Sequence, residues 1–326
     1  MLDFFVKSVD KTKNMSIIYS MKTEIQAPHG RETYIADFGD GLVMKRPLPE
    51  FSQVEKDKWL AKQHRTKDVI DEINAVNNPV YSIPYMLHIK DDEYQLLEER
   101  APGVPLTSDL YKSLTGRQRY EIVTSLAHFL VDMNELKTVK EETVHRMSNE
   151  LKMQKLQNII GNKMPKWFDL GSVKYVSKVI ERVHDFEYVT RKAWSHCDLN
   201  SGNVLYDAEA SRLYLIDFAE SDYNFIFRDI FSPLAVDLDI CEPIYEEYFK
   251  LHDEDKYLIY SPNSPELQNI MKYRKITVLL KRFTKAGDDL RLNPQSEKTK
   301  QNNIEKIEFM KDLIARIRYI EKQLTK

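Results

Sequence analysis

The stretch that decides the fold is Ser195-His196-Cys197-Asp198-Leu199-Asn200-Ser201-Gly202-Asn203, followed by Val204-Leu205-Tyr206 and, after a turn, Leu213-Tyr214-Leu215-Ile216-Asp217-Phe218. Two short apolar runs on either side of a turn predict a β-hairpin directly after a polar loop. The strand that begins at Val204 would pair with the strand that ends at Ile216. This pairing would bring Asp217 beside Asn203.

The polar loop holds the side chains that metal-assisted phosphate chemistry requires. Asp198 and Asn203 stand five residues apart in a loop that Gly202 allows to turn, so both can point at one place. With Asp217 they form an oxygen-rich site suited to Mg²⁺, which takes few protein ligands together with substrate phosphates. A carboxylate that is not bound to the metal can accept a proton from a hydroxyl nucleophile. The set therefore predicts phosphoryl transfer.

Composition limits the other possibilities. In 326 residues, 48 basic and 51 acidic side chains leave a net charge of −3, which provides no electrostatic footprint for nucleic acid or an anionic membrane. Only nine glycines are present, and neither a P-loop nor a dinucleotide-binding fingerprint occurs. Two cysteines make no disulfide framework, and charges interrupt every long apolar run. We therefore expect a cytoplasmic protein with no nucleic-acid or membrane partner.

The first hundred residues are rich in strand patterns. Two hairpins are expected, each with a polar or glycine-containing turn, and a charged helix is expected between them. The hairpins combine residues 33–38 with 42–45 around Gly39-Asp40-Gly41, and residues 85–89 with 94–97 around the turn 90–93; the helix covers 52–76. Ala101-Pro102-Gly103-Val104-Pro105 then interrupts regular structure. We place a boundary there, between an N-terminal lobe of residues 1–100 and a C-terminal lobe of residues 101–326.

Helical patterns dominate the second lobe. Apolar residues recur at three- and four-residue spacing between Arg117 and Leu136, which predicts one buried helix face. Two further charged stretches up to Thr190 and nearly all of the chain after Glu242 are also expected to be helical. The predicted fold class is α+β, with a small antiparallel sheet in the first lobe and a larger, mainly helical second lobe.

Three motifs occur in a characteristic order: H-x-D-x-x-x-x-N at His196–Asn203, I-D-F at Ile216–Phe218, and R-D-I at Arg228–Ile230. Together they resemble the signature of the aminoglycoside phosphotransferase and choline kinase superfamily. The stretch from Ile216 to Asn224 is particularly similar to choline/ethanolamine kinases. The resemblance implies a bilobal, protein-kinase-like fold and an enzyme that depends on ATP and Mg²⁺.

The resemblance also implies roles for the residues of the loop. Asp198 would be the catalytic base that orients and deprotonates the substrate hydroxyl. Asn203 and Asp217 would hold the Mg²⁺ ions that bridge the ATP phosphates.

Three neighbours of these residues have simpler interpretations. His196 could be a metal ligand or a base, but no second histidine lies at ligand spacing, so we favour a structural role in the loop. Asp229 would brace the loop, as the resemblance implies. Cys197 lies beside the base and invites a nucleophilic role, but we interpret it as a bystander.

The nucleotide-binding residues are expected in the first lobe. Lys45 matches the strand lysine that contacts the α- and β-phosphates. Its helix partner is expected to be Glu55, with Asp68 and Glu72 as alternatives. The remaining positions are Gly30, in the loop over the phosphates, and Glu99 with Ala101, at the hinge whose backbone would pair with adenine.

About twelve residues separate Asp217 from Asp229, with no A-P-E motif, which leaves little room for a segment that docks peptides. The acceptor is therefore expected to be a small molecule with a hydroxyl. Carboxylates and aromatic side chains are frequent after Asp217, and both favour cationic ligands, although ordinary surface acids and core aromatics explain them equally well. We expect a cationic, choline/ethanolamine-like or aminoglycoside-like alcohol. The carboxylates are Glu220, Asp222, Asp237, Asp239, Glu242, Glu246 and Glu247, and the aromatics Tyr223, Phe225, Phe227, Tyr245 and Tyr248; Glu220, Asp222 and Tyr223 are the nearest candidates.

Two alternatives stay open. The chain could be a catalytically silent scaffold that binds nucleotide, although such proteins usually lack at least one of Lys45, Asp198, Asn203 and Asp217. It could also be a kinase-like enzyme that acts on a protein, which the short segment after Asp217 disfavours.

Overall fold

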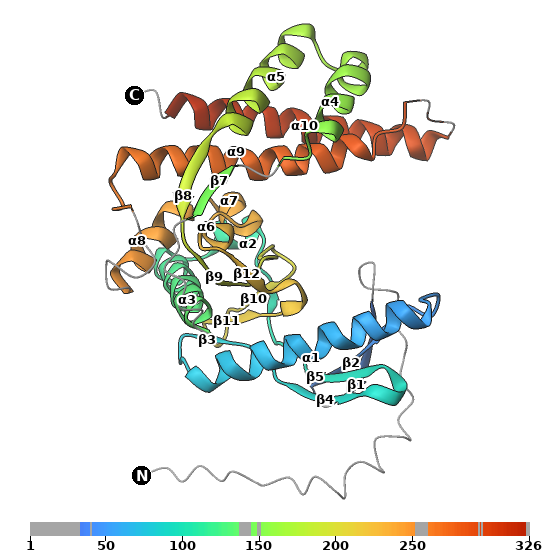
Figure 1. The fold of residues 1–326 in the computed structure, drawn as a ribbon, viewed down its shortest axis with the longest axis vertical. Coiled ribbons are helices and arrows are strands. Elements are labelled where there is room, and N and C mark those ends of the chain that lie inside the picture. The colour runs from blue at the N-terminus through green and yellow to red at the C-terminus, as the bar shows by residue number, and fades with distance from the viewer. Residues whose placement is uncertain are drawn as a thin grey trace, which may run out of the picture. The chain divides into compact units, whose positions relative to one another are not determined.

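The computed structural model describes residues 33–39, 41–136, 145–148, 151–251, 260–292, 294 and 296–323. The chain divides into two compact units, Met1–Asp71 with Ile83–Pro102, and Glu72–Ser82 with Gly103–Lys326. The first unit contains an antiparallel sheet and the second is mainly helical (Figure 1), which confirms the predicted α+β fold class. The division differs from a single cut after residue 100, because residues 72–82 group with the second unit.

The sheet of the first unit has the strand order β1-β2-β5-β4, and all of its pairs are antiparallel. Both predicted hairpins are confirmed. The strands are β1 (Thr33–Gly39), β2 (Leu42–Pro47), β4 (Met86–Lys90) and β5 (Gln95–Glu99), with a short 3₁₀ turn, η2 (Asp91–Glu93), between the last two. Leu96 in β5 is almost completely buried, as are Ala36 in β1 and Met86 in β4. The apolar positions of the three strands thus form the core under this sheet.

The predicted charged helix is α1 (Gln53–Val76). Ser52 directly precedes the helix, and its hydroxyl and backbone amide both donate to the carboxylate of Glu55, a helix-capping arrangement. Few apolar side chains interrupt its polar surface, but Trp59 and Val69 are buried. The indole of Trp59 also donates to Thr33 Oγ1 at 3.2 Å, which ties the helix to the first strand.

The second unit contains a four-stranded sheet, and the polar loop leads into one of its inner strands. Its strand order is β3-β11-β10-β6, and β3 pairs with β11 in parallel. The central pair is the predicted hairpin, with Val204 opposite Leu215. The bounds are β3 (Tyr81–Ser82), β6 (Val104–Pro105), β10 (Val204–Asp207) and β11 (Arg212–Leu215). Two-stranded pairs join β9 (Lys192–Ser195) to β12 (Asp222–Phe225), and β7 (His145–Ser148) to β8 (Glu187–Thr190).

Gly103 allows the segment Ala101-Pro102-Gly103-Val104-Pro105 to enter this sheet. Its φ is +93°, and a Cβ at this position would lie 2.7 Å from the backbone carbonyl carbon and oxygen of Tyr206. No side chain fits there, because the backbone before β6 must pass directly against β10.

Helices surround the sheets of the second unit. The predicted helix before Leu136 is α3 (Gly116–Glu135), and its apolar residues Ile122, Leu126 and Phe129 are buried as expected. Two long helices, α9 (Pro265–Asp288) and α10 (Glu297–Gln323), lie side by side (Figure 1). The others are α2 (Ser108–Ser113), α4 (Met153–Asn158), α5 (Leu170–Asp185), α6 (Phe227–Ile230), α7 (Pro233–Leu238) and α8 (Cys241–Leu251), with short turns η3 (Ile159–Lys163), η4 (Met164–Lys166) and η5 (Phe218–Glu220).

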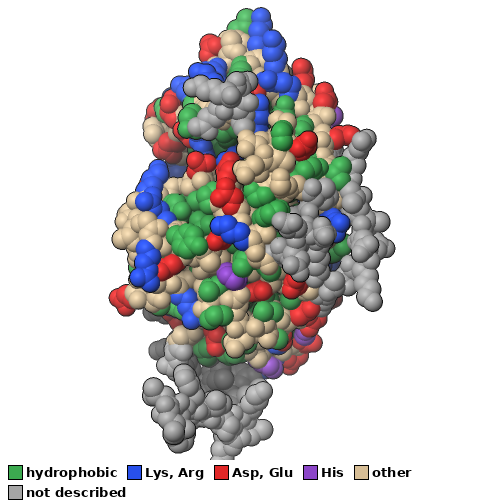
Figure 2. All heavy atoms as spheres, turned by 90° about the vertical axis from the view of Figure 1, so that its left-hand side faces the viewer, with side chains coloured by type: hydrophobic (Ala, Val, Ile, Leu, Met, Phe, Trp, Pro, Cys, Tyr) green, Lys and Arg blue, Asp and Glu red, His purple; other side chains and the backbone are tan. Residues whose placement is uncertain are grey.

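The surface agrees with the balanced composition. On the face drawn in Figure 2, lysine, arginine, aspartate and glutamate side chains are interspersed among apolar ones. Of the helices in the described ranges, not one combines the length and apolar character needed to cross a membrane.

Candidate active site

The polar loop between β9 and β10 holds Asp198 in a fixed position. The side-chain amide of Asn203 donates to the backbone carbonyl of Asp198 at 2.9 Å and to its carboxylate at 3.0 Å. Asn200 donates to the same carbonyl at 3.2 Å, and its own side-chain oxygen accepts from the amide of Gly202. Asp198 itself is half-buried. The loop thus presents one carboxylate whose direction is set by hydrogen bonds to its neighbours.

Asp229, the middle residue of the R-D-I motif, anchors the start of the loop. Its fully buried carboxylate accepts from the backbone amides of His196 at 2.6 Å and Cys197 at 3.0 Å. Burial raises the pKa of Asp229, while its electrostatic interaction with His196, the hydrogen bonds from the two amides and the charge of Arg228 act in the opposite direction. Through these bonds α6 supports the loop, and Cys197 adopts a left-handed conformation with φ +68°.

His196 is enclosed in the same network. Its Nε2 lies 3.0 Å from the carbonyl oxygen of Ile216, so Nε2 must carry the proton, and Nδ1 accepts from the amide of Asp198 at 3.4 Å. Both ring nitrogens are therefore occupied by backbone groups, and the side chain is completely buried. This geometry is that of a residue that links the loop to the end of β11.

Asp217 follows β11 and lies beside Asn203 along the strand pair. The amide of Ile216 donates to the carbonyl of Asn203 at 3.0 Å, which continues the ladder to the last residue before Asp217. Asp217 has φ +61° and ψ +63°, a left-handed conformation that is uncommon outside glycine and concentrates at functional sites. Its exposed side chain makes no hydrogen bond or ion pair with any part of the chain that the structure describes.

The donor set suits a hard cation with few protein ligands. Because Asn203 turns its nitrogen toward Asp198, its side-chain oxygen faces away from that carboxylate. Asp217 directly follows Ile216, whose amide is bonded to the carbonyl of Asn203. The described residues contain no group of three or more His, Cys, Asp or Glu that could hold a metal. Two oxygen ligands fit Mg²⁺, which keeps water and substrate phosphates for its other positions.

In the first unit, Lys45 is paired differently from the expectation. Its ammonium lies 2.6 Å from the carboxylate of Glu98 on the neighbouring strand, and both side chains are mostly buried (18% and 17% exposed). Glu55 instead accepts from the hydroxyl and amide of Ser52, which lower its pKa. The structure therefore differs from the expected Lys45–Glu55 pair, because a glutamate in the first turn of a helix is drawn to the free amides there.

The remaining nucleotide-binding candidates have clear positions where they are described. The amide of Glu99 donates to the carbonyl of Tyr85, and the Glu99 carboxylate accepts from the amide of Tyr85. Ala101 lies beyond the end of β5 and is half-buried. Gly30 lies outside the described residues.

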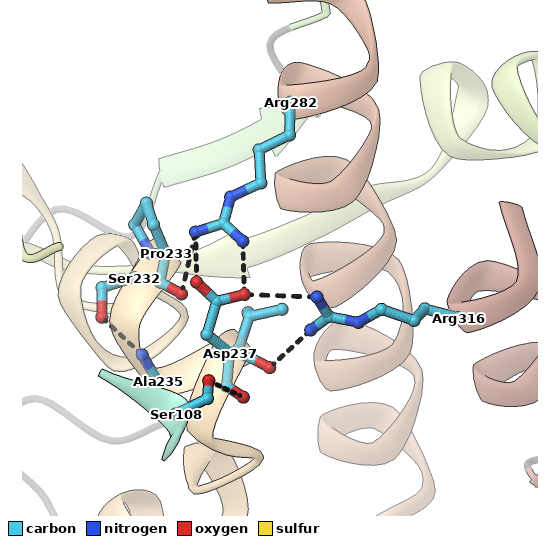
Figure 3. A network of polar contacts seen from close by, with 8 residues as sticks. Ser108, Ser232, Pro233, Ala235, Asp237, Arg282 and Arg316 are labelled. Carbon is cyan, nitrogen blue, oxygen red and sulfur yellow. Dashed lines mark hydrogen bonds and ion pairs between the residues drawn. The ribbon is translucent and has the colours of Figure 1, made fainter. Parts of the chain in front are cut away.

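The carboxylates expected to recognise a cation are largely neutralised by the protein itself. Figure 3 shows Asp237 held by two arginines, Arg282 from α9 and Arg316 from α10. Lys275 pairs with both Asp239 and Glu242. Lys250 pairs with Glu247, and Glu246 is exposed.

The other candidates for recognising a cation are Glu220, Asp222 and Tyr223, together with the remaining aromatic side chains. Asp222 is exposed, and its carboxylate accepts from the amide of Tyr223, which is half-buried in β12. Glu220 is exposed on η5. Three of the five aromatic side chains, Phe227, Tyr245 and Tyr248, belong to the buried core. The expected cationic acceptor therefore stays a prediction.

Sequence reasoning missed a basic pocket of about 260 Å³ beside the loop. Its wall includes Cys197 from the loop, Asn224 and Phe225 from β12, and one face of α9. Five cationic residues line it: Arg228, Arg274, Lys281, Arg282 and Lys285. The signal that could have found it is the spacing of the last four, which falls on one side of a helix.

Comparison with known proteins adds independent evidence. A family model described as "Phosphotransferase enzyme family" (APH) matches residues 38–255. No curated protein sequence matches the chain. Similar solved structures include the GDP and kanamycin complex of APH(2'')-IIIa, with 14% identity, a TM-score of 0.62, and coverage of 94% of this chain and 98% of that one. The ADP-bound aminoglycoside phosphotransferase APH(2'')-Ib has 12% identity, a TM-score of 0.52, and coverage of 92% and 96%. At such identities the structural likeness concerns the fold.

Proposed function

This chain belongs to the phosphotransferase enzyme family and is a kinase with a hydroxyl group as acceptor, and on this premise we propose that it transfers the γ-phosphate of ATP to a small molecule with the help of Mg²⁺. The observation that carries the proposal is that Asn203 holds the carboxylate of Asp198 by its side chain and is bonded through its backbone to Ile216, the residue before Asp217. The carboxylate of Asp198 suits a general base, and the carboxylate of Asp217 suits a metal ligand.

The roles follow from the chemistry of each group. Asp198 orients the acceptor hydroxyl and accepts its proton as the hydroxyl oxygen forms a bond to the γ-phosphorus. The bond from that phosphorus to the bridging oxygen breaks, and ADP leaves with the electron pair. Asn203 and Asp217 would hold Mg²⁺, which when bound supplies positive charge to the phosphate oxygens.

The nucleotide-binding roles are assigned to the first hundred residues, and the catalytic roles to residues 101–326. Lys45, oriented by Glu98, would contact the phosphates, and the backbone of Glu99 and Ala101 would pair with adenine. Gly30 would belong to the loop over the phosphates.

The short segment after Asp217 supports a small acceptor. Between Asp217 and Asp229 the chain forms η5, β12 and the start of α6, and β12 is paired with β9 along its length. A segment occupied in this way by its own secondary structure provides no extended surface on which a peptide could dock.

The proposal is tested by measuring ADP release and phosphorylated product with the purified chain, Mg²⁺, and either ATP or GTP across a panel of amino alcohols, aminoglycosides, nucleosides, sugars and hydroxy acids. Asp198→Asn should lower turnover by ~10²–10⁴-fold and leave nucleotide affinity nearly unchanged, since it removes the base alone. Asp109→Asn, an exposed change on α2, is the matched control.

Two results would contradict the proposal. Full activity of Asp198→Asn would remove Asp198 as the base. Tight nucleotide binding without product from any acceptor would favour the scaffold alternative.

A further inference from the structure

The basic pocket differs from the other charged regions of the second unit because no carboxylate lines it. Its lining residues among those described comprise five cationic, several apolar and a few neutral polar side chains. Elsewhere in this unit, cations and carboxylates meet in pairs, as Lys275 does with Glu242 and Lys155 with Asp288. A cavity lined by one sign of charge concentrates ions of the opposite sign.

Three of the five cations, Arg228, Lys281 and Arg282, interact with other parts of the protein. Arg282 forms a two-pronged ion pair with Asp237 and also donates to the carbonyl of Pro233 (Figure 3). Arg228 donates to the carbonyl of Cys197 at 3.4 Å, which is a dipole and not a counter-charge. The pocket therefore retains positive charge after the internal pairs are subtracted.

The environment of Arg274 is independent evidence that the pocket binds an anion. Its side chain lines the pocket, only 9% of the residue is exposed, and its Nε is buried without a hydrogen-bond partner. The guanidinium lies 6.0 Å from the ring centre of Tyr188 and makes no ion pair with any described residue. Burying a guanidinium without a carboxylate is costly unless something else supplies the negative charge.

Lys285 adds an exposed cation at the same cavity. It lies eleven residues after Arg274 on α9, which returns it to the same helix face, and it forms no ion pair within the described chain. A buried, rigid guanidinium together with an accessible ammonium is a combination that suits a phosphate or a carboxylate.

We propose that this pocket binds an anionic group, a phosphate or a carboxylate, carried by the hydroxyl acceptor. The inference rests on the proposed function and names the class of its substrate: a small hydroxy acid or an organic phosphate with a free hydroxyl. Cys197, one residue before Asp198 in the chain, is among the residues that line the pocket. On this adjacency the proposal places the anionic group of a small acceptor in the pocket and its hydroxyl at Asp198.

The anion site is tested first without nucleotide. Thermal unfolding of the full chain is followed while inorganic phosphate or acetate is added, with sodium chloride of equal ionic strength as reference. We expect saturable stabilisation of the wild type and at least a tenfold weaker apparent affinity in Arg274→Gln. In buffer without these anions, Arg274→Gln should unfold at an equal or higher temperature, because it removes an uncompensated buried charge.

Two variants keep this test decisive. Lys285→Gln changes an exposed residue, so it should weaken anion binding without a folding defect. Arg117→Gln removes an exposed charge on α3 and should bind the anion as the wild type does. If neither anion stabilises the wild type beyond chloride, or if Arg117→Gln loses the effect as Arg274→Gln does, the inference is wrong.

The acceptor role is then tested with matched three-carbon alcohols. With ATP and Mg²⁺, glycerol 3-phosphate and glycerate should have kcat/KM values at least tenfold above those of glycerol and 3-amino-1,2-propanediol. Arg274→Gln should reduce this advantage while the KM for ATP stays unchanged. Preference for the amine would overturn the inference and leave the proposed function in place. Phosphate binding without phosphorylation of any alcohol would overturn the proposed function and the acceptor role with it.

Discussion

The side-chain amide of Asn203 donates to both the backbone carbonyl and the carboxylate of Asp198, at 2.9 and 3.0 Å. These two hydrogen bonds from one side-chain amide fix the carboxylate of Asp198 relative to the loop backbone. It also decides how the amide is turned, since the nitrogen faces Asp198 and the oxygen faces away. A single side chain thereby aligns the proposed base and contributes a ligand oxygen to the proposed metal site.

Replacing Asn203 should therefore disturb two functions at once. We expect Asn203→Ala to lower kcat by ~10²-fold, because the base loses its orientation, and to raise the Mg²⁺ concentration needed for half-maximal rate. Steady-state rates measured over a range of Mg²⁺ concentrations would check both effects. Asn200→Ala is the control, since Asn200 contacts only the backbone carbonyl of Asp198 and the amide of Gly202; it should cost less than ~10-fold. Equal effects of the two changes would contradict the assigned role.

The partner of Lys45 can be identified by comparing two glutamates. Glu98→Gln removes a counter-charge from a mostly buried ion pair, so we expect the KM for ATP to rise about tenfold, equivalent to ~1.4 kcal/mol. Glu55→Gln should leave that KM unchanged and slightly lower the melting temperature, because Glu55 caps α1 through Ser52. Nucleotide titrations and thermal melts of both variants would decide. The reverse pattern would restore Glu55 as the functional partner.

Gly103 should tolerate no side chain. Gly103→Ala would combine a φ of +93° with a Cβ 2.7 Å from the backbone of Tyr206, so we expect a loss of about 1–3 kcal/mol in the free energy of unfolding. Gly116→Ala, at the start of α3 with open space around a Cβ, should be neutral or stabilising. Urea unfolding of both variants makes the comparison, and equal stability of the two would show that β6 can move away from β10.

Cys197 should behave as an unreactive thiol despite its place beside Asp198. Burial, assisted by the charge of Asp229, raises its pKa from 9.0 to about 12, which reduces the thiolate fraction near pH 8 by about a thousandfold. Alkylation by iodoacetamide, followed by intact mass, should therefore be slow in the native chain and fast after denaturation. The neutral thiol is the favoured form, so its contribution to stability is present below pH 9 and is lost as the pH rises toward 12. Rapid alkylation of Cys197 in the native chain would contradict a buried thiol with a raised pKa.

Local sequence was sufficient for much of the fold. The hairpins of the first unit were predictable because glycine or acidic turns lie directly between alternating apolar runs, and the pairing of Val204 with Leu215 followed from a similarly short turn. The helix α3 was predictable because its apolar residues repeat at three- and four-residue spacing over its full length. In each case the interacting residues are close in sequence, so few conformations compete.

The charge partners were not predictable in the same way. Lys45 pairs with Glu98 across 53 positions, and Asp237 pairs with Arg282 and Arg316 across 45 and 79. Many acids and bases are spread along this chain, and sequence distance carries no information about which of them meet once strands and helices pack. This is why acidic residues after Asp217 suggested a cationic acceptor, although α9 and α10 supply cations that neutralise several of them.

The sequence by itself determined which groups the loop carries, since the identities and order of His196, Asp198, Asn203 and Asp217 already indicated phosphoryl transfer. Tertiary structure alone decided the electrostatic environment of that loop. Arg274 is an ordinary helix residue in the sequence. It becomes a buried cation without an ion pair to any described residue only because α9 lies against Tyr188 of β8, which is distant along the chain. The reacting groups are encoded locally, whereas the field around them arises from long-range packing.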